Sequence, residues 1–138
     1  MKRKATAVWN GSGKEGNGTL STQSGVISNT KYSYNTRFGE EKGTNPEELI
    51  AAAHAGCFSM KLSFVIGNSS LKPDKIETTA TVTLGDGAIT DIHLDVKAKI
   101  PGATAAQFQE WANDAKNNCP VSKVLRAANI TMDAKLEG

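Results

Sequence analysis

The sequence contains few of the residues on which the simplest functional assignments depend. Among its 138 residues there are only two cysteines and two histidines, and the net charge is +2. So small a charge provides no electrostatic footprint for nucleic acid, and we expect no nucleic-acid partner. With two histidines, a zinc site would need unusual ligands. Walker, Rossmann, HExxH and GxSxG motifs are also lacking, so we expect no metal and no bound cofactor.

The N-terminus lacks the apolar run of a secretory signal, and we expect none. Two cysteines without such a signal favour reduced thiols in a cytosol-like compartment, so we predict a cytoplasmic protein. The most apolar stretch, residues 49–66, is interrupted by His54 and Lys61. It predicts a buried core helix rather than a membrane span.

Residue periodicity predicts an α+β fold in a single domain over residues 1–138. Alternating apolar and polar residues, separated by Gly-rich or Asn-rich turns, predict a three-stranded meander, a β-hairpin and a final strand. These strands are expected at residues 2–9, 19–21, 26–34, 76–84, 92–100 and 130–136.

Between the meander and the hairpin, the pattern predicts a long helix from Asn45 to about Ile66. Asn45 suits the N-cap, Pro46 suits the first helical position, and Glu48 completes a capping box. The helix is apolar nearly all round, so we expect it to be central and buried on most sides.

Two further helices are expected after the hairpin. The first begins at Thr104, with Gln107 as its capping-box partner. The second begins at Cys119-Pro120 and runs to about residue 128. Its inward side chains are predicted to be Val121, Val124 and Leu125.

Cys57 lies in the long helix directly after residues 51–56, which are small except for His54. Apolar surroundings raise a thiol pKa, whereas a cation beside the sulfur favours the thiolate. Glu47 stands almost three turns earlier, about 15 Å along the axis, too far for a direct hydrogen bond. Arg37 has the reach and the carboxylate-matching fork to bridge them. We therefore hypothesise that Glu47 holds Arg37 and that Arg37 faces Cys57.

Cys119 stands at the predicted first turn of a short helix, where the dipole and free N–H groups favour a thiolate. A disulfide with Cys57 needs the two Cα atoms within about 7 Å, and the sequence alone does not give that distance. The alternative is that these residues are inert. Cys57 is then a small core hydrophobe, Arg37 a surface charge and Glu47 a complement to the helix dipole.

The two histidines have no recognisable triad context. We expect His54 to be a core or dimer-contact residue. Lys61, one turn beyond Cys57, is expected to extend its charged end to solvent, with a secondary charge effect on the thiol.

These residues together closely resemble the OsmC/Ohr family. The resemblance covers essentially the whole chain, and its longest motifs are Arg37-Phe38, Gly43-Thr-Asn-Pro-Glu-Glu-Leu-Ile-Ala-Ala-Ala-His-Ala-Gly-Cys57 and Asn118-Cys119-Pro120-Val121-Ser122. An arginine shortly before the helix resembles the OsmC, or osmotically inducible, branch. Ohr proteins carry theirs in the N-terminal Gly-rich turn, which here (residues 10–18) contains no arginine.

The resemblance implies an OsmC-like fold, with antiparallel sheets wrapped around a long central cysteine-bearing helix in an intertwined homodimer. It also implies a cysteine-based peroxidase, an oxidoreductase that reduces organic hydroperoxides to alcohols in oxidative and osmotic stress defence. Cys57 resembles the peroxidatic cysteine and Cys119 the resolving one, while Arg37 and Glu47 resemble the activating pair. Lys61 stands where many relatives are expected to have a small residue.

In the implied cycle, a hydroperoxide converts Cys57 to a sulfenic acid and Cys119 condenses with it to a disulfide. An external dithiol then restores both thiols, and lipoylated proteins do so in the Ohr branch. We predict an apolar substrate pocket lined by Phe38, Phe58 and Met60. Two alternatives remain: a non-catalytic redox sensor or binding protein on the same fold, and a structural stress protein with unreactive thiols.

Overall fold

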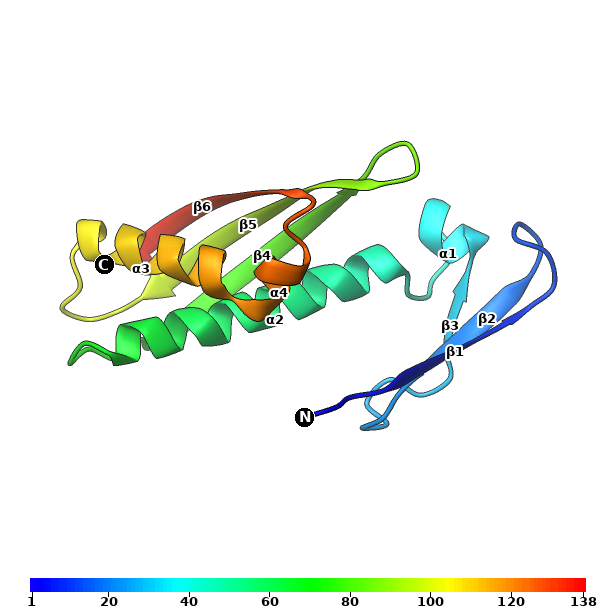
Figure 1. Ribbon diagram of the computed structural model, residues 1–138, viewed down its shortest axis with the longest axis horizontal. Helices are drawn as coiled ribbons and strands as arrows, with labels where there is room; N and C mark the ends of the chain where they lie inside the picture. Colours follow the sequence, from blue (N-terminus) through cyan, green and yellow to red (C-terminus); the bar gives the residue numbers. More distant parts are fainter. The chain divides into compact units, whose positions relative to one another are not determined.

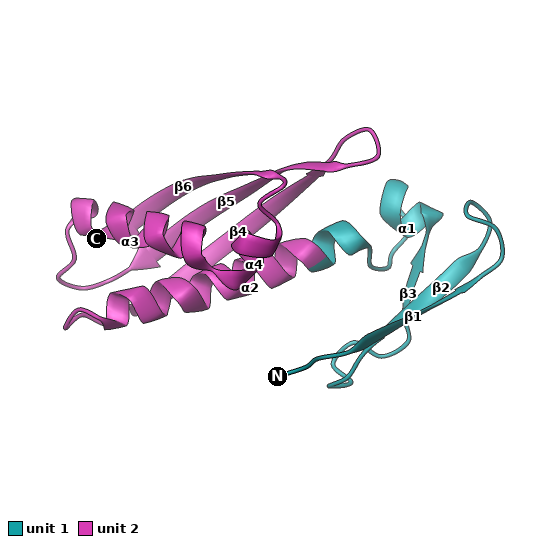
Figure 2. Ribbon diagram, viewed as in Figure 1, with its two compact units in different colours: residues 1–49 teal, residues 50–138 magenta.

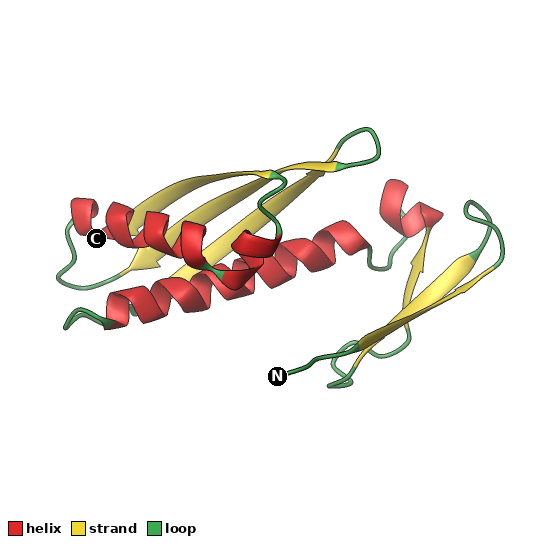
Figure 3. Cartoon of the chain, viewed as in Figure 1, coloured by secondary structure: helices red, strands yellow, loops and turns green.

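The computed structural model describes residues 1–138 and combines sheets with helices, which confirms the α+β class (Figures 1 and 3). The chain divides into two compact units, coloured separately in Figure 2. Unit 1 spans Met1–Leu49 and unit 2 spans Ile50–Gly138. The single domain over residues 1–138 stays a prediction, and each unit is described by itself.

Unit 1 is a three-stranded antiparallel sheet followed by a short helix. Its strands lie in the order β1-β2-β3, which confirms the predicted meander. The elements are β1 (Ala5–Asn10), β2 (Asn17–Thr22), β3 (Thr30–Ser33) and α1 (Tyr34–Phe38).

Helix α1 was not predicted, because its capping pair is unusual. The Ser33 hydroxyl accepts from the backbone N–H of Thr36 at 3.2 Å, and the Thr36 hydroxyl accepts from the backbone N–H of Ser33 at 2.7 Å. Thr36 therefore performs the reciprocal role that Glu or Gln has in most capping boxes.

Unit 2 is a second three-stranded sheet with helices on one face. Its strands lie in the order β4-β5-β6, and β5 pairs antiparallel with β4 but parallel with β6. The parallel pair departs from the all-antiparallel sheets we expected. It requires a crossover between β5 and β6, which α3 and α4 supply. The elements are α2 (Pro46–Gly67, which begins in unit 1), β4 (Lys75–Leu84), β5 (Ile89–Lys99), α3 (Ala105–Asn118), α4 (Pro120–Val124) and β6 (Asn129–Glu137).

The hydrophobic core of the chain lies in unit 2, between the sheet and the two longer helices. From Ile92 to Lys99, strand β5 alternates, so that one face is buried and the other polar. Helices α2 and α3 pack against this buried face. The side chains that they use are spaced three or four residues apart and therefore lie on one side of each helix. The buried core consists of Phe58, Leu62, Ile66, Ile92, Leu94, Val96, Ala98, Ile100, Phe108 and Ala115.

Helix α2 begins as the sequence predicts, except for one hydrogen bond. The Asn45 side chain accepts from the Glu48 backbone N–H at 2.8 Å, which confirms Asn45 as the N-cap. The Glu48 carboxylate does not return the bond and instead accepts from the Thr44 hydroxyl at 3.0 Å. Helix α3 does carry the complete predicted capping box, formed by Thr104 and Gln107.

Only one face of α2 is buried within the chain, so the expectation of cover on most sides is wrong for the single chain. The opposite face exposes Met60 by 65% and Phe64 by 69%, together with small residues such as Gly56. By length and composition alone α2 is able to cross a membrane. Its buried face packs instead against a sheet, as in the core helix of a globular protein.

Helix α4 is shorter than predicted and ends at Val124. Val124 is 77% exposed, so its predicted inward position is wrong, and Ser122 is the buried residue of this helix. With only five residues, the helix turns its hydroxyl-bearing side inward and Val124 outward.

Candidate active site

The two cysteines meet in unit 2. Cys57 lies midway along α2, and Cys119 is the N-cap residue of α4, directly before Pro120. Both are free thiols, and their sulfur atoms lie 2.6 Å apart, with the Cys119 S–H as donor. A disulfide has about 2.05 Å between the sulfurs, so this pair is close enough to form one once an oxidant removes two electrons from it. Cys119 is fully buried, whereas Cys57 is partly exposed.

The surroundings of Cys57 act on its ionisation in opposite directions. Burial raises the pKa of the Cys57 thiol above its ordinary value, and the hydrogen bond with Cys119 acts in the same direction. The backbone of Val121 and the charge of Lys61 both lower that pKa, but by less. The secondary charge effect expected of Lys61 is thus present. Unit 2 by itself favours the neutral thiol, so an efficient nucleophile here needs a further cation.

Unit 1 contains an arginine that is held by a carboxylate. The guanidinium of Arg37, on α1, holds the Glu47 carboxylate in a forked ion pair. Nη2 donates to Oε1 at 2.6 Å, while Nε lies 3.1 Å from Oε1 and 3.2 Å from Oε2. This geometry confirms that Glu47 holds Arg37. Because of this bond, the pKa of Glu47 lies below its usual range, and the pair stays ionised.

An aromatic hollow of about 270 Å³ adjoins Arg37 within unit 1. Both tyrosines of the chain, Tyr32 and Tyr34, line it together with Trp9 and Phe38. The rings are in contact: Trp9 and Tyr32 centroids lie 5.2 Å apart, and those of Tyr34 and Phe38 lie 4.8 Å apart. The Arg37 guanidinium carbon lies 5.1 Å from the Phe38 centroid, so it forms a cation–π contact at the rim.

Gly18 allows the Trp9 and Tyr32 rings to lie this close to β2. A β-carbon at this position would lie 2.6 Å from the Tyr32 ring and 2.9 Å from that of Trp9, and it would also clash with the carbonyl oxygen of Val8. Trp9, Tyr32 and Tyr34 were not predicted as lining residues. Their signal was the cluster of aromatic residues in unit 1, flanking an arginine.

The model of the OsmC-like protein family matches residues 39–135, a range that includes Glu47 and both cysteines. The chain belongs to the OsmC-like family. It is 49% identical to the peroxiredoxin OsmC of Escherichia coli over 99% of this chain and 98% of that protein. It is 34% identical to the organic hydroperoxide resistance protein OhrA of Bacillus subtilis over 70% of this chain and 68% of the relative.

Solved structures of OsmC-like proteins have the same fold. An OsmC-like protein from Mycoplasma pneumoniae matches with a TM-score of 0.78 and 16% identity, over 100% of this chain and 99% of that one. The organic hydroperoxide resistance protein OhrB of Bacillus subtilis matches with a TM-score of 0.66 and 26% identity, over 97% and 98%. The predicted OsmC-like fold is confirmed.

The three residues predicted to line the substrate pocket fall in different environments of this OsmC-like chain. Phe38 lines the aromatic hollow. Met60 lines a separate hollow of about 380 Å³ with Phe64 on α2. Phe58 has no exposed surface, because it points from α2 into the core against the sheet, so within one chain it lines neither hollow. A single pocket formed by these residues stays a prediction.

His54 lies in the core, as one of its two expected roles requires. Its Nε2 atom is 2.7 Å from the Ser122 hydroxyl of α4, and both residues are buried. Burial lowers the pKa of His54, so the ring is neutral near pH ~7. The role of Ser122 was not foreseen, because a serine after Cys-Pro-Val carries no signal without its spatial partner.

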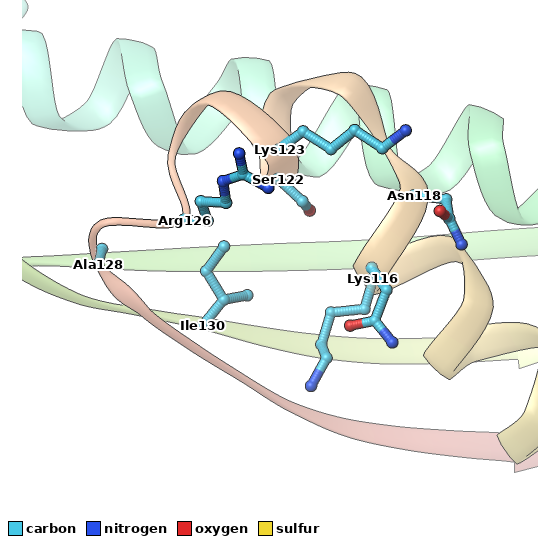
Figure 4. Close-up of a pocket in the computed structure, with 8 residues that line it drawn as sticks. Lys116, Asn118, Ser122, Lys123, Arg126, Ala128 and Ile130 are labelled. Carbon is cyan, nitrogen blue, oxygen red and sulfur yellow. The ribbon is translucent and has the colours of Figure 1, made fainter.

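A basic hollow of about 500 Å³ lies beside the segment that carries Cys119 (Figure 4). Lys116, Lys123 and Arg126 line it, and none of them forms a salt bridge. The remaining lining residues are Asn117, Asn118, Ser122, Ala128 and Ile130. With three cations and no carboxylate in its lining, this surface is electropositive.

The only group of residues with a metal-ligand geometry lies away from the cysteines. His93, Asp95 and Asp133 place their ligand atoms within 4.8 Å of one another on β5 and β6. They occupy the polar face of the sheet, whereas α2 covers the opposite face. His93 already contacts Thr131 at 2.6 Å and Asp133 at 3.1 Å, so hydrogen bonds within the sheet account for the group.

Proposed function

We propose that this protein is a thiol-dependent peroxidase that reduces organic hydroperoxides to alcohols in oxidative and osmotic stress defence. The observation that carries the proposal is the pair of free thiols whose sulfurs lie 2.6 Å apart on two different helices. Relatives named peroxiredoxin and organic hydroperoxide resistance protein support it. A purely structural pair would be served equally well by small apolar residues.

In the first step, the Cys57 thiolate attacks the distal oxygen of the hydroperoxide. The O–O bond breaks, the alkoxide takes a proton and leaves as the alcohol, and Cys57 becomes a sulfenic acid. Arg37 stabilises the thiolate and the negative charge that develops on the leaving oxygen. Its ion pair with Glu47 supports this role, because it orients the guanidinium in advance.

In the second step, Cys119 attacks the sulfenic sulfur. An S–S bond forms, the S–O bond breaks, and the hydroxide leaves as water with the proton of the Cys119 thiol. In the third step, an external dithiol reduces the disulfide by two thiol exchanges and itself becomes a cyclic disulfide. A lipoylated protein in the cytoplasm is the reductant that we propose.

The aromatic hollow beside Arg37 supports a preference for organic over hydrogen peroxide. An alkyl or aryl hydroperoxide gains free energy by burying its apolar part against Trp9, Tyr32 and Phe38, whereas hydrogen peroxide has no such part. The hollow is open and small, which suits a compact organic group.

The uncovered face of α2 supports an intertwined homodimer. Met60 and Phe64 are more than half exposed, and small residues at Ala53 and Gly56 share their side of the helix. Small residues allow the backbone of a second helix to approach closely. We propose that a second copy covers this face, and light scattering tests it: the wild type should have twice the chain mass, and Phe64→Glu should shift it towards one chain.

The peroxidase proposal is tested by following hydroperoxide consumption under excess dihydrolipoamide. Wild type should turn over cumene hydroperoxide many times and hydrogen peroxide more slowly, and Cys57→Ser should abolish both reactions. Without the dithiol, Cys119→Ser should still consume one equivalent of hydroperoxide but should not form the intramolecular disulfide. Thiols of the wild type that oxidise once without turnover would instead establish a redox sensor. Thiols that do not react would contradict both functions.

A further inference from the structure

A buried hydrogen bond runs parallel to the cysteine pair and joins the same two helices. His54 precedes Cys57 by three residues on α2, and Ser122 follows Cys119 by three residues at α4. Each partner is thus about one helical turn from its cysteine. The Nε2–Oγ distance is 2.7 Å and the sulfurs lie 2.6 Å apart, so both side-chain pairs link these elements, beside the contact of the Val121 backbone with Cys57.

Placing His54 in the core lowers the stability of the folded protein. His54 is fully buried, and its Nδ1 atom has no hydrogen-bond partner. An unpartnered polar atom in a protein interior costs stability, whereas an apolar side chain of similar shape would not. Packing alone therefore gives no reason for a histidine here. The bond to Ser122 is what this side chain provides that a leucine or phenylalanine cannot.

Because Ser122 lies on the segment that begins with Cys119, its hydrogen bond to His54 also fixes the position of Cys119. Helix α4 has only five residues, of which Val124 is exposed and Ser122 is the buried one, so its apolar anchors are limited to the cap residues Cys119 and Leu125. A short segment of this kind opens locally with little cost unless something anchors it. Figure 4 shows Ser122 on this segment between Lys123 and Asn118, at the edge of the basic hollow.

We propose that His54 and Ser122 are positioning residues for the resolving step. Their hydrogen bond, here called the His54–Ser122 tie, holds the Cys119 segment against α2 so that Cys119 attacks the Cys57 sulfenic acid as soon as it forms. This inference rests on the proposed peroxidase function. It adds that the tie governs the second step and not the attack on hydroperoxide.

The physical reason is a competition for one sulfur atom. The sulfenic acid at Cys57 either condenses with Cys119, releasing water, or meets a second hydroperoxide and becomes a sulfinic acid. In the second case the hydroperoxide transfers another oxygen and leaves as alcohol. Holding Cys119 in place raises its effective concentration and favours the disulfide. Without the tie, more of the Cys57 population should be over-oxidised.

The experiment compares Ser122→Ala with wild type in a rapid-quench reaction with cumene hydroperoxide. Mass spectrometry measures three forms of Cys57: dimedone-trapped sulfenic acid, disulfide and sulfinic acid. We expect Ser122→Ala to slow disulfide formation about tenfold, the value of one buried hydrogen bond. The rate of the first oxidation should change by less than about twofold. Ser122→Thr, which retains the hydroxyl, should restore rapid disulfide formation.

The matched control is Ser59→Ala. Ser59 lies on α2, the helix that carries His54 and Cys57. Its hydroxyl donates to the Thr78 hydroxyl of β4, also at 2.7 Å, but it does not contact α4. If Ser59→Ala slows disulfide formation as much as Ser122→Ala, the effect is general loosening of the fold and the tie has no special role. Thermal unfolding of each variant shows that the comparison is made between folded proteins.

A second readout does not depend on peroxidase activity. Equilibration of the Cys57–Cys119 disulfide with a glutathione redox buffer measures the effective concentration of the two thiols directly. Ser122→Ala should lower it about tenfold and Ser59→Ala should not. If the protein does not turn over hydroperoxide but Ser122→Ala still lowers the effective concentration, the proposed role of the tie is supported and the proposed peroxidase function is refuted. An unchanged equilibrium and an unchanged disulfide rate would overturn the tie.

Discussion

The two units of this protein differ in what their side chains bury. In unit 2, one face of a sheet and two helices enclose a continuous apolar core. In unit 1, no apolar side chain is fully buried within the chain, and Val8 and Phe38 are each about half exposed. A unit of this size without a core is not stable by itself. Unit 1 therefore needs cover that its own residues do not supply.

The groups that could take part in chemistry are divided between the two units. Unit 2 carries both thiols and the core that holds them together. Unit 1 carries the Arg37–Glu47 ion pair and the aromatic hollow. The proposed nucleophile and its proposed activator thus belong to units that differ in how much apolar surface they bury. Such a division accords with the proposed homodimer, because a second copy would cover exposed apolar residues of both units.

The largest expected effect comes from a cavity in the core of unit 2. Leu62→Ala, at a fully buried position of α2, should lower the free energy of unfolding by about 3 kcal/mol. Val8→Ala in unit 1 should cost under about 0.5 kcal/mol if a single chain is the whole structure. Urea unfolding at two protein concentrations measures both. A larger, concentration-dependent cost at Val8 would show that a second copy covers unit 1.

The next effect concerns Arg37, the proposed activator, in unit 1. Arg37→Met should reduce kcat/KM for cumene hydroperoxide about a hundredfold, because a charge-stabilising donor is lost. Arg37→Lys keeps the positive charge but loses the planar guanidinium that binds a carboxylate with two N–H donors. Its kcat/KM should lie between those of wild type and Arg37→Met. The control is Lys31→Met, which breaks the ion pair with Glu41, the other one of unit 1; neither of these two residues lines the hollow. Equal losses for Lys31→Met and Arg37→Met would remove the special role of Arg37.

A smaller effect is expected at the start of α3, in unit 2. Thr104→Ala removes the hydroxyl that accepts from the Gln107 backbone N–H at 3.1 Å. The free energy of unfolding should fall by about 1 kcal/mol, and Thr104→Ser should recover most of it. Thermal unfolding gives both values. If serine were no better than alanine, the capping bond would not account for the loss.

The smallest effect is a pH dependence of unit 1. Arg37 holds the pKa of Glu47 below the usual carboxyl value of about 4.3. The pKa of Glu47 is lower in the folded protein than in the unfolded chain. The ion pair therefore stabilises the fold at pH values above the unfolded pKa, and this stabilisation is lost as the pH falls through the folded pKa. The pair is partly exposed, so the effect should be modest. The melting temperature of wild type minus that of Glu47→Gln, measured from about pH 6 to about pH 2, should show a plateau and then decline. If this difference in melting temperature increased as the pH fell, Arg37 would not lower the pKa of Glu47 in the folded protein.

Much of the fold was predictable because its signals are local. The alternation in β4 and β5, the N-cap Asn45 and the Thr104 capping box each depend on residues a few positions apart. The predictions failed where the decisive neighbour is distant. The parallel pairing of β6 with β5 depends on a crossover, and the outward position of Val124 depends on which side of α4 meets α2.

For the site, the sequence by itself determined the chemistry that is available: two thiols, an arginine with a carboxylate partner, and motifs that resemble one family. Residue types and order are properties of the chain, so a single sequence can reveal them. Only the tertiary structure decided that the sulfurs lie 2.6 Å apart, that His54 bonds to Ser122, and that rings from β1, β3 and α1 form a hollow. Each of these contacts joins elements whose approach is set by packing and sheet pairing, for which no short stretch of sequence carries the information.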